Sequence, residues 1–228
     1  MRKAAIFVEG QTELIFVRRL IEEMAGAHNV VFHEEKYHAK TYQTLSAVTP
    51  AGEAFFILLV NCCADNAVLS AILDRHPGLS NANYEIIIGL RDLYPLSHAD
   101  LPVLSQSINS QLPAAGTIVS VIIAVAEVEA WFVQENLHFP IIDAAITRDS
   151  IQTAFNYDID NDLAENLSNP ALSLDSFYKI ANKRYTKKRA RISRTVGALD
   201  IDHLYLDRRV MLPSFDSFAL ELENFFNF

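Results

Sequence analysis

The stretch AAIFVEGQTE, residues 4–13, places an apolar run directly before a carboxylate and a glycine. Residues 4–8 are all apolar, which predicts a β-strand buried on both faces, as in a parallel sheet covered by helices. Glu9 and Gly10 follow, and the apolar side chains of residues 14–24 then recur at helical spacing. A buried strand that ends in a charged side chain suggests that the strand holds that carboxylate in place.

The first half of the chain continues this alternation of apolar strands and helices. Helical segments separate the further strands that we expect, which are residues 30–38, 54–61, 84–90 and 117–126. Almost entirely apolar strands separated by helices predict a mostly parallel α/β sheet with helices on both faces. After residue 139, Asn, Asp, Ser and Pro interrupt short helical segments. We therefore expect an α/β core over residues 1–139 and a mainly helical C-terminal extension over residues 140–228.

The composition is that of a folded protein. Half of the 228 residues are hydrophobic and 21% are charged, which allows one large domain or a domain with a smaller addition. The longest apolar run, residues 119–126, is far shorter than the roughly 20 residues of a membrane-spanning helix. Cys62 and Cys63 are neighbours, which disfavours a structural disulfide or a zinc site. We expect a cytoplasmic protein.

Basic residues are concentrated in one segment of an acidic chain. The net charge is −9, which by itself argues against a general nucleic-acid binder. Residues 179–194, KIANKRYTKKRARISR, contain eight of the 19 Lys and Arg residues and no acid, so the remainder carries 11 basic against 28 acidic residues, a net of −17. This local excess predicts contact with a polyanion. The alternative is a solvated helix face that balances the acidic body.

The basic segment supplies the candidate nucleic-acid contacts. Lysine and arginine neutralise phosphates, and a tyrosine can stack on a base or hydrogen-bond to a phosphate. The candidates are Lys183, Arg184, Tyr185, Lys187, Lys188, Arg189 and Arg191.

Carboxylates follow three of the expected strands. The carboxyl ends of parallel strands share one edge of a sheet, where ligands bind in open α/β folds. Carboxylates gathered there repel one another, and a hard divalent cation such as Mg²⁺ relieves the repulsion. Such an ion can polarise a phosphate and activate a water molecule. The acids are Glu9, Asp92, Glu127 and Glu129.

Each acid also has a simpler interpretation. An acid after a strand often caps the next helix and interacts favourably with its dipole. Glu13 fits this reading, as it lies in the first helical turn, and Asp92 could pair with Arg91 or begin a turn before Pro95. The recurrence on three strands favours a shared site. Glu9 also precedes a glycine, which leaves backbone room for a ligand.

These residues resemble a known family. FVEGQTE is similar to the first motif of the Toprim domain of primases, topoisomerases and the overcoming-lysogenization-defect nucleases. The likeness is greatest to small stand-alone Toprim-like proteins of bacterial defence loci, often encoded beside ABC-type ATPases. The ordered motifs span nearly the whole chain and are VEGQTE at Val8, EVEAW at Glu127, NP at Asn169, YTK at Tyr185 and PSF at Pro213.

The resemblance implies a Rossmann-like Toprim core and a nuclease that uses Mg²⁺ or Mn²⁺ on DNA or RNA. In such domains the first glutamate is a general acid or base, and later acids bind the metal. The implied catalytic residues are Glu9, Asp92 and Lys187, and the implied metal ligands are Glu9, Asp92, Glu127 and Glu129. By the same resemblance, the protein would be an antiviral defence effector regulated by an ABC-type ATPase.

The chain departs from the Toprim pattern at one point. Toprim domains usually carry an Asp-x-Asp pair on the strand of Asp92, whereas here Leu90 and Tyr94 stand at the two partner positions. Glu127 or Glu129 would then supply the missing ligand.

Two rival interpretations follow. One is a catalytically degenerate module that binds an ATPase partner or nucleic acid. The other is a nucleotide-binding regulator, although the chain has no glycine-rich phosphate loop. A homodimer is a further expectation, because the apolar tail FALELENFFNF, residues 218–228, could pack on itself or on another subunit.

Overall fold

The computed structural model describes residues 1–38, 41–47, 55–64 and 67–227, and the chain forms two compact units. The first unit comprises Met1–Asp92, Ala99–Ile123 and Ser217–Phe228, and the second comprises Leu93–His98 and Ala124–Asp216. The division expected at residue 139 differs from these units. The second unit begins earlier, at Ala124, and the end of the chain belongs to the first unit.

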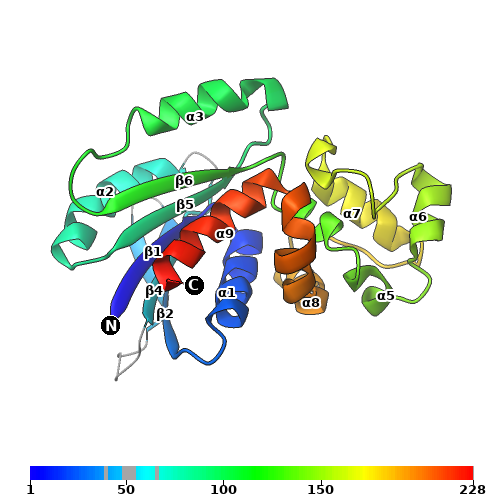
Figure 1. The fold of residues 1–228 in the computed structure, drawn as a ribbon, viewed down its shortest axis with the longest axis horizontal. Helices are drawn as coiled ribbons and strands as arrows, with labels where there is room; N and C mark the ends of the chain where they lie inside the picture. The colour runs from blue at the N-terminus through cyan, green and yellow to red at the C-terminus, as the bar shows by residue number, and fades with distance from the viewer. Residues whose placement is uncertain (39–40, 48–54, 65–66, 228) are drawn as a thin grey trace. The chain divides into compact units, whose positions relative to one another are not determined.

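The first unit contains a six-stranded sheet in the order β3-β2-β4-β1-β5-β6 (Figure 1). The strands are β1 (Arg2–Val8), β2 (Val30–His38), β3 (Thr41–Ser46), β4 (Phe55–Asn61), β5 (Ile86–Asp92) and β6 (Ile118–Ala124). β1 pairs in parallel with β4 and β5, β2 pairs in parallel with β4, and β3 runs antiparallel to β2. The α/β class with a mostly parallel sheet is confirmed. Ala54, which the prediction placed in a strand, lies outside the described residues.

One face of this sheet packs on α2 (Ala67–Asn81). Phe7 of β1 and Leu58 of β4 share a buried cluster with Val68 and Ile72 of α2. Side chains alternate between the faces of a strand, so the neighbouring residues of β1 and β4 point to the opposite face. Residues 4–8 are all fully buried, as their uniformly apolar sequence predicts.

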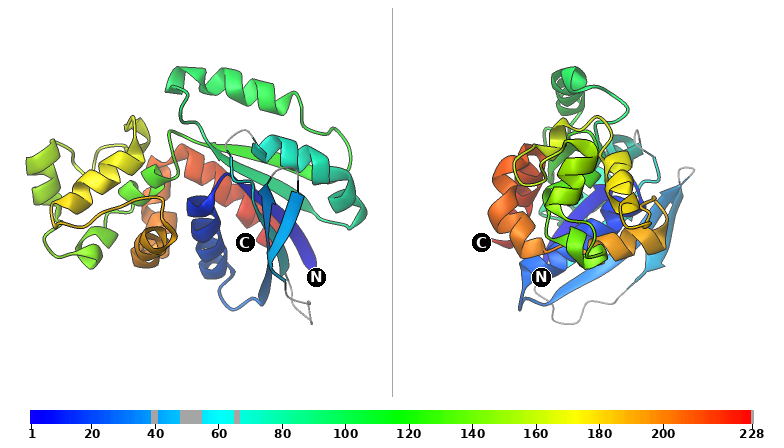
Figure 2. Two further views of the ribbon diagram at one scale, coloured as in Figure 1. Left: turned by 180° about the vertical axis from the view of Figure 1, so that it is seen from behind. Right: turned by 90° about the vertical axis from the view of Figure 1, so that its right-hand side faces the viewer.

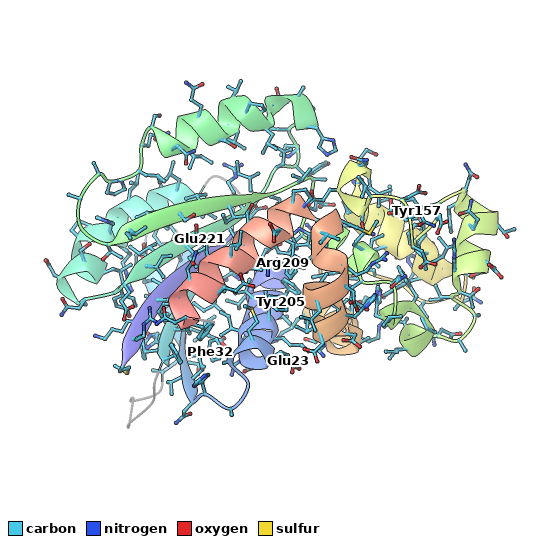
Figure 3. The ribbon with its side chains drawn as sticks, viewed as in Figure 1. Glu23, Phe32, Tyr157, Tyr205, Arg209 and Glu221 are labelled. Atoms are coloured by element: carbon cyan, nitrogen blue, oxygen red, sulfur yellow. The ribbon has the colours of Figure 1, made fainter. Side chains whose placement is uncertain are left out.

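The opposite face carries α1 (Gln11–Ala25) and the end of α9 (Pro213–Phe226). The Arg18 guanidinium of α1 lies 4.8 Å from the ring centroid of Phe32 on β2. Phe32 is labelled in Figure 3. Phe225 and Phe226 of α9 contact Phe55 of β4, with ring centroids 5.5 and 4.8 Å apart. Figure 2 shows the first unit from two further directions, with α1 and α2 on different sides of the strands. Phe225 and Phe226 of the apolar tail therefore pack on their own chain, and the homodimer stays a prediction.

The second unit is helical, as expected for the C-terminal part. Its α-helices are α4 (Glu129–Gln134), α5 (His138–Ile142), α6 (Arg148–Phe155), α7 (Pro170–Lys179) and α8 (Arg189–Ala198). Shorter helical turns are η2 (Ala164–Asn166), η3 (His203–Arg208) and η4 (Arg209–Met211). The first unit adds α3 (Leu101–Asn109), and η1 (His98–Asp100) begins in the second unit and ends in the first. Within the described ranges, every helix is too short or too polar to cross a membrane.

Trp131 is part of the buried core of the second unit. It is fully buried, and its indole N–H donates to Ser214 Oγ at 2.9 Å. The Ser214 N–H donates in turn to Glu165 Oε1 at 3.1 Å. Burial raises the pKa of Glu165, and the bonds from Ser214 partly offset that rise. The tryptophan of EVEAW and the serine of PSF are thus partners in one structural contact.

Gly89 of β5 allows α2 to approach the sheet closely. A Cβ at this position would lie 2.8 Å from Ile72 Cδ1 and 3.1 Å from Val121 Cγ2. Gly78, on α2 itself, has no atom within 4 Å of the corresponding point. The same substitution should therefore have opposite effects at the two glycines.

We predict that Gly89→Ala lowers the free energy of unfolding by about 1–3 kcal/mol, because the added methyl group overpacks the contact with Ile72. Gly78→Ala should raise it by about 0.5–1 kcal/mol, because alanine favours a helix interior. Urea unfolding measures both values. Equal shifts of the two variants would contradict this account of the packing.

Candidate functional site

Glu9 and Asp92 meet at the carboxyl ends of adjacent strands in the first unit. β1 pairs with β5, Glu9 directly follows β1, and Asp92 is the last residue of β5. The backbone N–H of Asp92 donates to Glu9 Oε2 at 2.9 Å. This bond holds the Glu9 carboxylate against the end of β5, and Asp92 is itself buried. The expected shared edge is therefore present for these two acids.

The first turn of α1 adds a buried acid beside this edge. Glu13 is 3% exposed, and a Cβ at Gly10 would lie only 3.1 Å from Glu13 Oε2. Gly10 thus leaves room for the Glu13 carboxylate, whereas the sequence suggested only a helix-dipole role for that acid. At the end of β4, burial raises the pKa of Cys62 to about 12, and Cys63 and Glu9 act in the same direction. The Cys62 side chain is therefore a neutral thiol at physiological pH.

Glu127 and Glu129 are buried in the second unit, at 4% and 0% exposure. Each carboxylate has one oxygen bound by an uncharged donor. The Ala171 N–H donates to Glu127 Oε2 at 3.1 Å, and the Tyr185 hydroxyl donates to Glu129 Oε1 at 2.8 Å. The other two oxygens face Lys187, whose Nζ lies 3.0 Å from Glu127 Oε1 and 3.7 Å from Glu129 Oε2.

The NP motif creates the donor for Glu127. Asn169 caps α7 by accepting the N–H of Leu172 at 2.8 Å, and Pro170 has no N–H to satisfy. The N–H of Ala171 is one of the groups that a helix leaves unpaired in its first turn. It is therefore available to donate to Glu127. This arrangement gives the motif a physical role in the site.

Asp175 of α7 holds the segment that leads to Lys187. It accepts hydrogen bonds from Arg184 Nε and Nη2 at 2.9 and 3.1 Å and from the Tyr185 N–H at 2.9 Å. Lys179 adds an ion pair at 2.8 Å. Burial alone would raise the pKa of Asp175, but these donors lower it to about 2. The carboxylate therefore stays ionised and fixes the backbone two residues before Lys187.

The structure corrects the surface role predicted for Tyr185. Its side chain is 2% exposed, and its hydroxyl donates to Glu129. The buried ring is not accessible for stacking on a base, and the hydroxyl binds a carboxylate where a phosphate was expected. A tyrosine between basic residues looked exposed because its buried partner lies 56 positions away in the chain.

The remaining basic candidates divide into two groups. Lys183 and Arg184 face acids of their own unit, since Lys183 Nζ lies 3.7 Å from Asp143 and Arg184 binds Asp175. The other group lies at the start of α8. There Lys188 and Arg189 are exposed, and Arg191 donates to Thr186 Oγ1 at 3.3 Å.

Glu127 and Glu129 form a buried acidic pair of the second unit that could hold a metal ion. Each offers one carboxylate oxygen, and these two oxygens lie within 4.8 Å of each other. An all-carboxylate donor set suits a hard divalent cation.

The other predicted ligands lie in the first unit. There Glu9 Oε2 accepts the Asp92 N–H, and the role of both residues as metal ligands stays a prediction. Leu90, at the position of the absent Toprim aspartate, is fully buried and pairs with Val8 in the sheet. Both acids of the second unit come from the EVEAW motif.

No protein-family model, curated protein or solved structure matches this chain. The Toprim resemblance therefore stays a prediction, and the functional argument depends on the geometry described above.

We predict that Asp175→Asn destabilises the protein by about 1–2 kcal/mol at pH 7, because it weakens the charge-assisted bonds that hold Arg184 and Tyr185. The lowered pKa means that ionised Asp175 stabilises the fold above about pH 4, and that this contribution disappears as the pH falls toward 2. The difference between wild type and variant should shrink over that range.

Chemical denaturation at a series of pH values measures this difference. Asp202→Asn, which changes an exposed aspartate of the same unit, is the matched control. A difference between wild type and Asp175→Asn that stays constant from pH 5 to pH 2 would contradict the assignment.

Proposed function

We propose that this protein is a metal-dependent phosphodiesterase that hydrolyses DNA or RNA. The observation that supports it most is the pair of buried carboxylates in the second unit, Glu127 and Glu129, whose oxygens lie within 4.8 Å of each other. The Toprim resemblance implies Asp92 as a further ligand. Carboxylates this close repel one another, and their burial removes the water that would screen them. Mg²⁺ or Mn²⁺ fits such oxygen ligands and relieves the repulsion.

The proposed chemistry needs a metal and a group that transfers a proton. A bound metal would polarise a phosphate group and lower the pKa of a water molecule. The Toprim resemblance makes Glu9 the candidate for proton transfer, and the Asp92 N–H holds its Oε2 and thereby orients the carboxylate. A positioned carboxylate of this kind typically contributes 10²–10⁴-fold to a reaction rate.

The start of α8 is the proposed contact for the substrate backbone. Lys188 and Arg189 are exposed there, in a chain whose net charge is otherwise strongly negative. Exposed cations beside the N–H groups of a helix N-terminus attract phosphates. By resemblance alone, the proposal extends to antiviral defence and to regulation by an ABC-type ATPase.

A second candidate is a non-catalytic module that binds an ATPase or nucleic acid. It is favoured by Leu90, a core residue that stands where Toprim domains carry an aspartate. This candidate requires no metal, so calorimetric titration with Mg²⁺ separates it from the enzyme.

The catalytic assignment is tested by nuclease assays with Mg²⁺ or Mn²⁺ on single- and double-stranded DNA and RNA. We predict that Glu9→Gln reduces cleavage by about 10²–10⁴-fold, because the amide cannot exchange a proton. Glu23→Gln, an exposed glutamate at the other end of α1, should cleave as wild type does. Equal cleavage by wild type and Glu9→Gln would refute the role of Glu9.

A further inference from the structure

We infer that Lys187 is a built-in competitor of the metal, so that its ammonium group and a divalent cation occupy the carboxylates of Glu127 and Glu129 in alternation. The inference depends on the metal site of the proposed function. It goes further by assigning control of that site to one side chain, and it does not depend on which bond the enzyme cleaves.

In each of the two glutamates, one carboxylate oxygen already accepts a hydrogen bond from an uncharged donor. Glu127 Oε2 accepts the Ala171 N–H, and Glu129 Oε1 accepts the Tyr185 hydroxyl. The oxygens that remain for a metal are Glu127 Oε1 and Glu129 Oε2. These are the two atoms that face Lys187 Nζ, at 3.0 and 3.7 Å. The ammonium group therefore stands where the metal would need to bind.

Size and charge make the two occupants mutually exclusive. Mg²⁺ binds carboxylate oxygens at about 2.0–2.1 Å, and an ammonium group 3.0 Å from the same oxygen of Glu127 would lie within a few ångströms of the ion. Two cations that close, in a site removed from water, repel strongly. Only one of them can neutralise the buried carboxylates at a time.

The exposure of the three side chains shows which partner can move. The side chains of Glu127 and Glu129 are 6% and 0% exposed, whereas that of Lys187 is 50% exposed. Lys187 therefore reaches the acids from the solvent side, and its flexible stem can swing away without leaving a cavity in the core. The backbone nearby stays in place, because Asp175 binds the Tyr185 N–H.

Exchange gives Lys187 two successive roles. Without metal, its ammonium group neutralises carboxylates whose burial would otherwise be costly. With metal, the released ammonium group lies at the entrance of the site, where it can contact a phosphate of the substrate. Metal binding and phosphate binding would then favour each other, because both occur in the state in which Lys187 is displaced from the carboxylates.

Direct metal binding tests the exchange without any enzymatic assay. Mn²⁺ titration followed by electron paramagnetic resonance should show that Lys187→Met binds Mn²⁺ about tenfold more tightly than wild type, because the competing cation is gone. Lys187→Arg should stay near wild type because it keeps the charge. Arg148→Met removes an exposed cation elsewhere in the same unit and should leave the affinity unchanged.

The results separate this inference from the proposed function. Binding that is unchanged or weaker in Lys187→Met overturns the competition while the metal site stands. Failure of both wild type and Lys187→Met to bind Mn²⁺ at millimolar concentration overturns the competition and the metal site together.

A second measurement uses the wild-type protein, so it does not depend on how the variants fold. Acetylation by a small amine-reactive reagent, followed site by site by mass spectrometry, should become faster at Lys187 when Mg²⁺ is added and stay constant at Lys188. Slower or unchanged acetylation of Lys187 in Mg²⁺ would overturn the exchange.

Discussion

Two carboxylates that are shielded from water, those of Glu127 and Glu129, set the main constraint on the second unit. A buried charge is tolerated only where hydrogen bonds and an opposite charge compensate it. Three groups compensate the two charges, namely a helix N–H from Ala171, a hydroxyl from Tyr185 and an ammonium group from Lys187. A neutral residue at either position would not need this arrangement, which points to a role for the charge itself.

This constraint explains why short motifs far apart in the sequence occur together. NP turns a helix N-terminus toward Glu127, and YTK supplies both the hydroxyl and the ammonium group. PSF contributes Ser214, whose hydroxyl oxygen accepts a hydrogen bond from the indole N–H of Trp131. Trp131 stands two residues after Glu129 in the sequence. Four of the five motifs are therefore parts of one structural network in the second unit. The fifth, VEGQTE, supplies Glu9 at the end of the first strand, and the Glu9 carboxylate accepts the N–H of Asp92.

Sequence reasoning succeeded where local pattern determines structure. The apolar residues 4–8 of β1 and the alternation of strands and helices were sufficient to predict a mostly parallel sheet. Sequence reasoning failed where contacts with residues distant in the sequence determine the structure. The antiparallel β3, residues 41–46, is largely exposed, so its sequence carries no apolar signal. β6 reads as a buried strand but lies at the edge of the sheet, where most of its side chains are only partly covered.

The site was predicted to a similar extent. Asp92 could be selected because it ends a parallel strand, and the edge shared by parallel strands places it beside Glu9. Glu127 and Glu129 could be selected because they come shortly after β6. The burial of Tyr185 and Glu13 could not be foreseen, because both depend on tertiary contacts rather than on neighbours in sequence. Arg184, which the sequence suggested as a polyanion contact, instead forms an ion pair with Asp175 of its own unit. This pairing also depends on a tertiary contact.

The central claim is that the buried carboxylates of Glu127 and Glu129 bind a divalent cation. A crystal structure of the protein in Mn²⁺, with the ion located by its anomalous scattering, tests this claim most directly. The account predicts a single strong peak within coordination distance of Glu127 and Glu129, with the Lys187 side chain displaced. A protein saturated with Mn²⁺ that shows no peak at these carboxylates, with Lys187 still bound to Glu127, would contradict it.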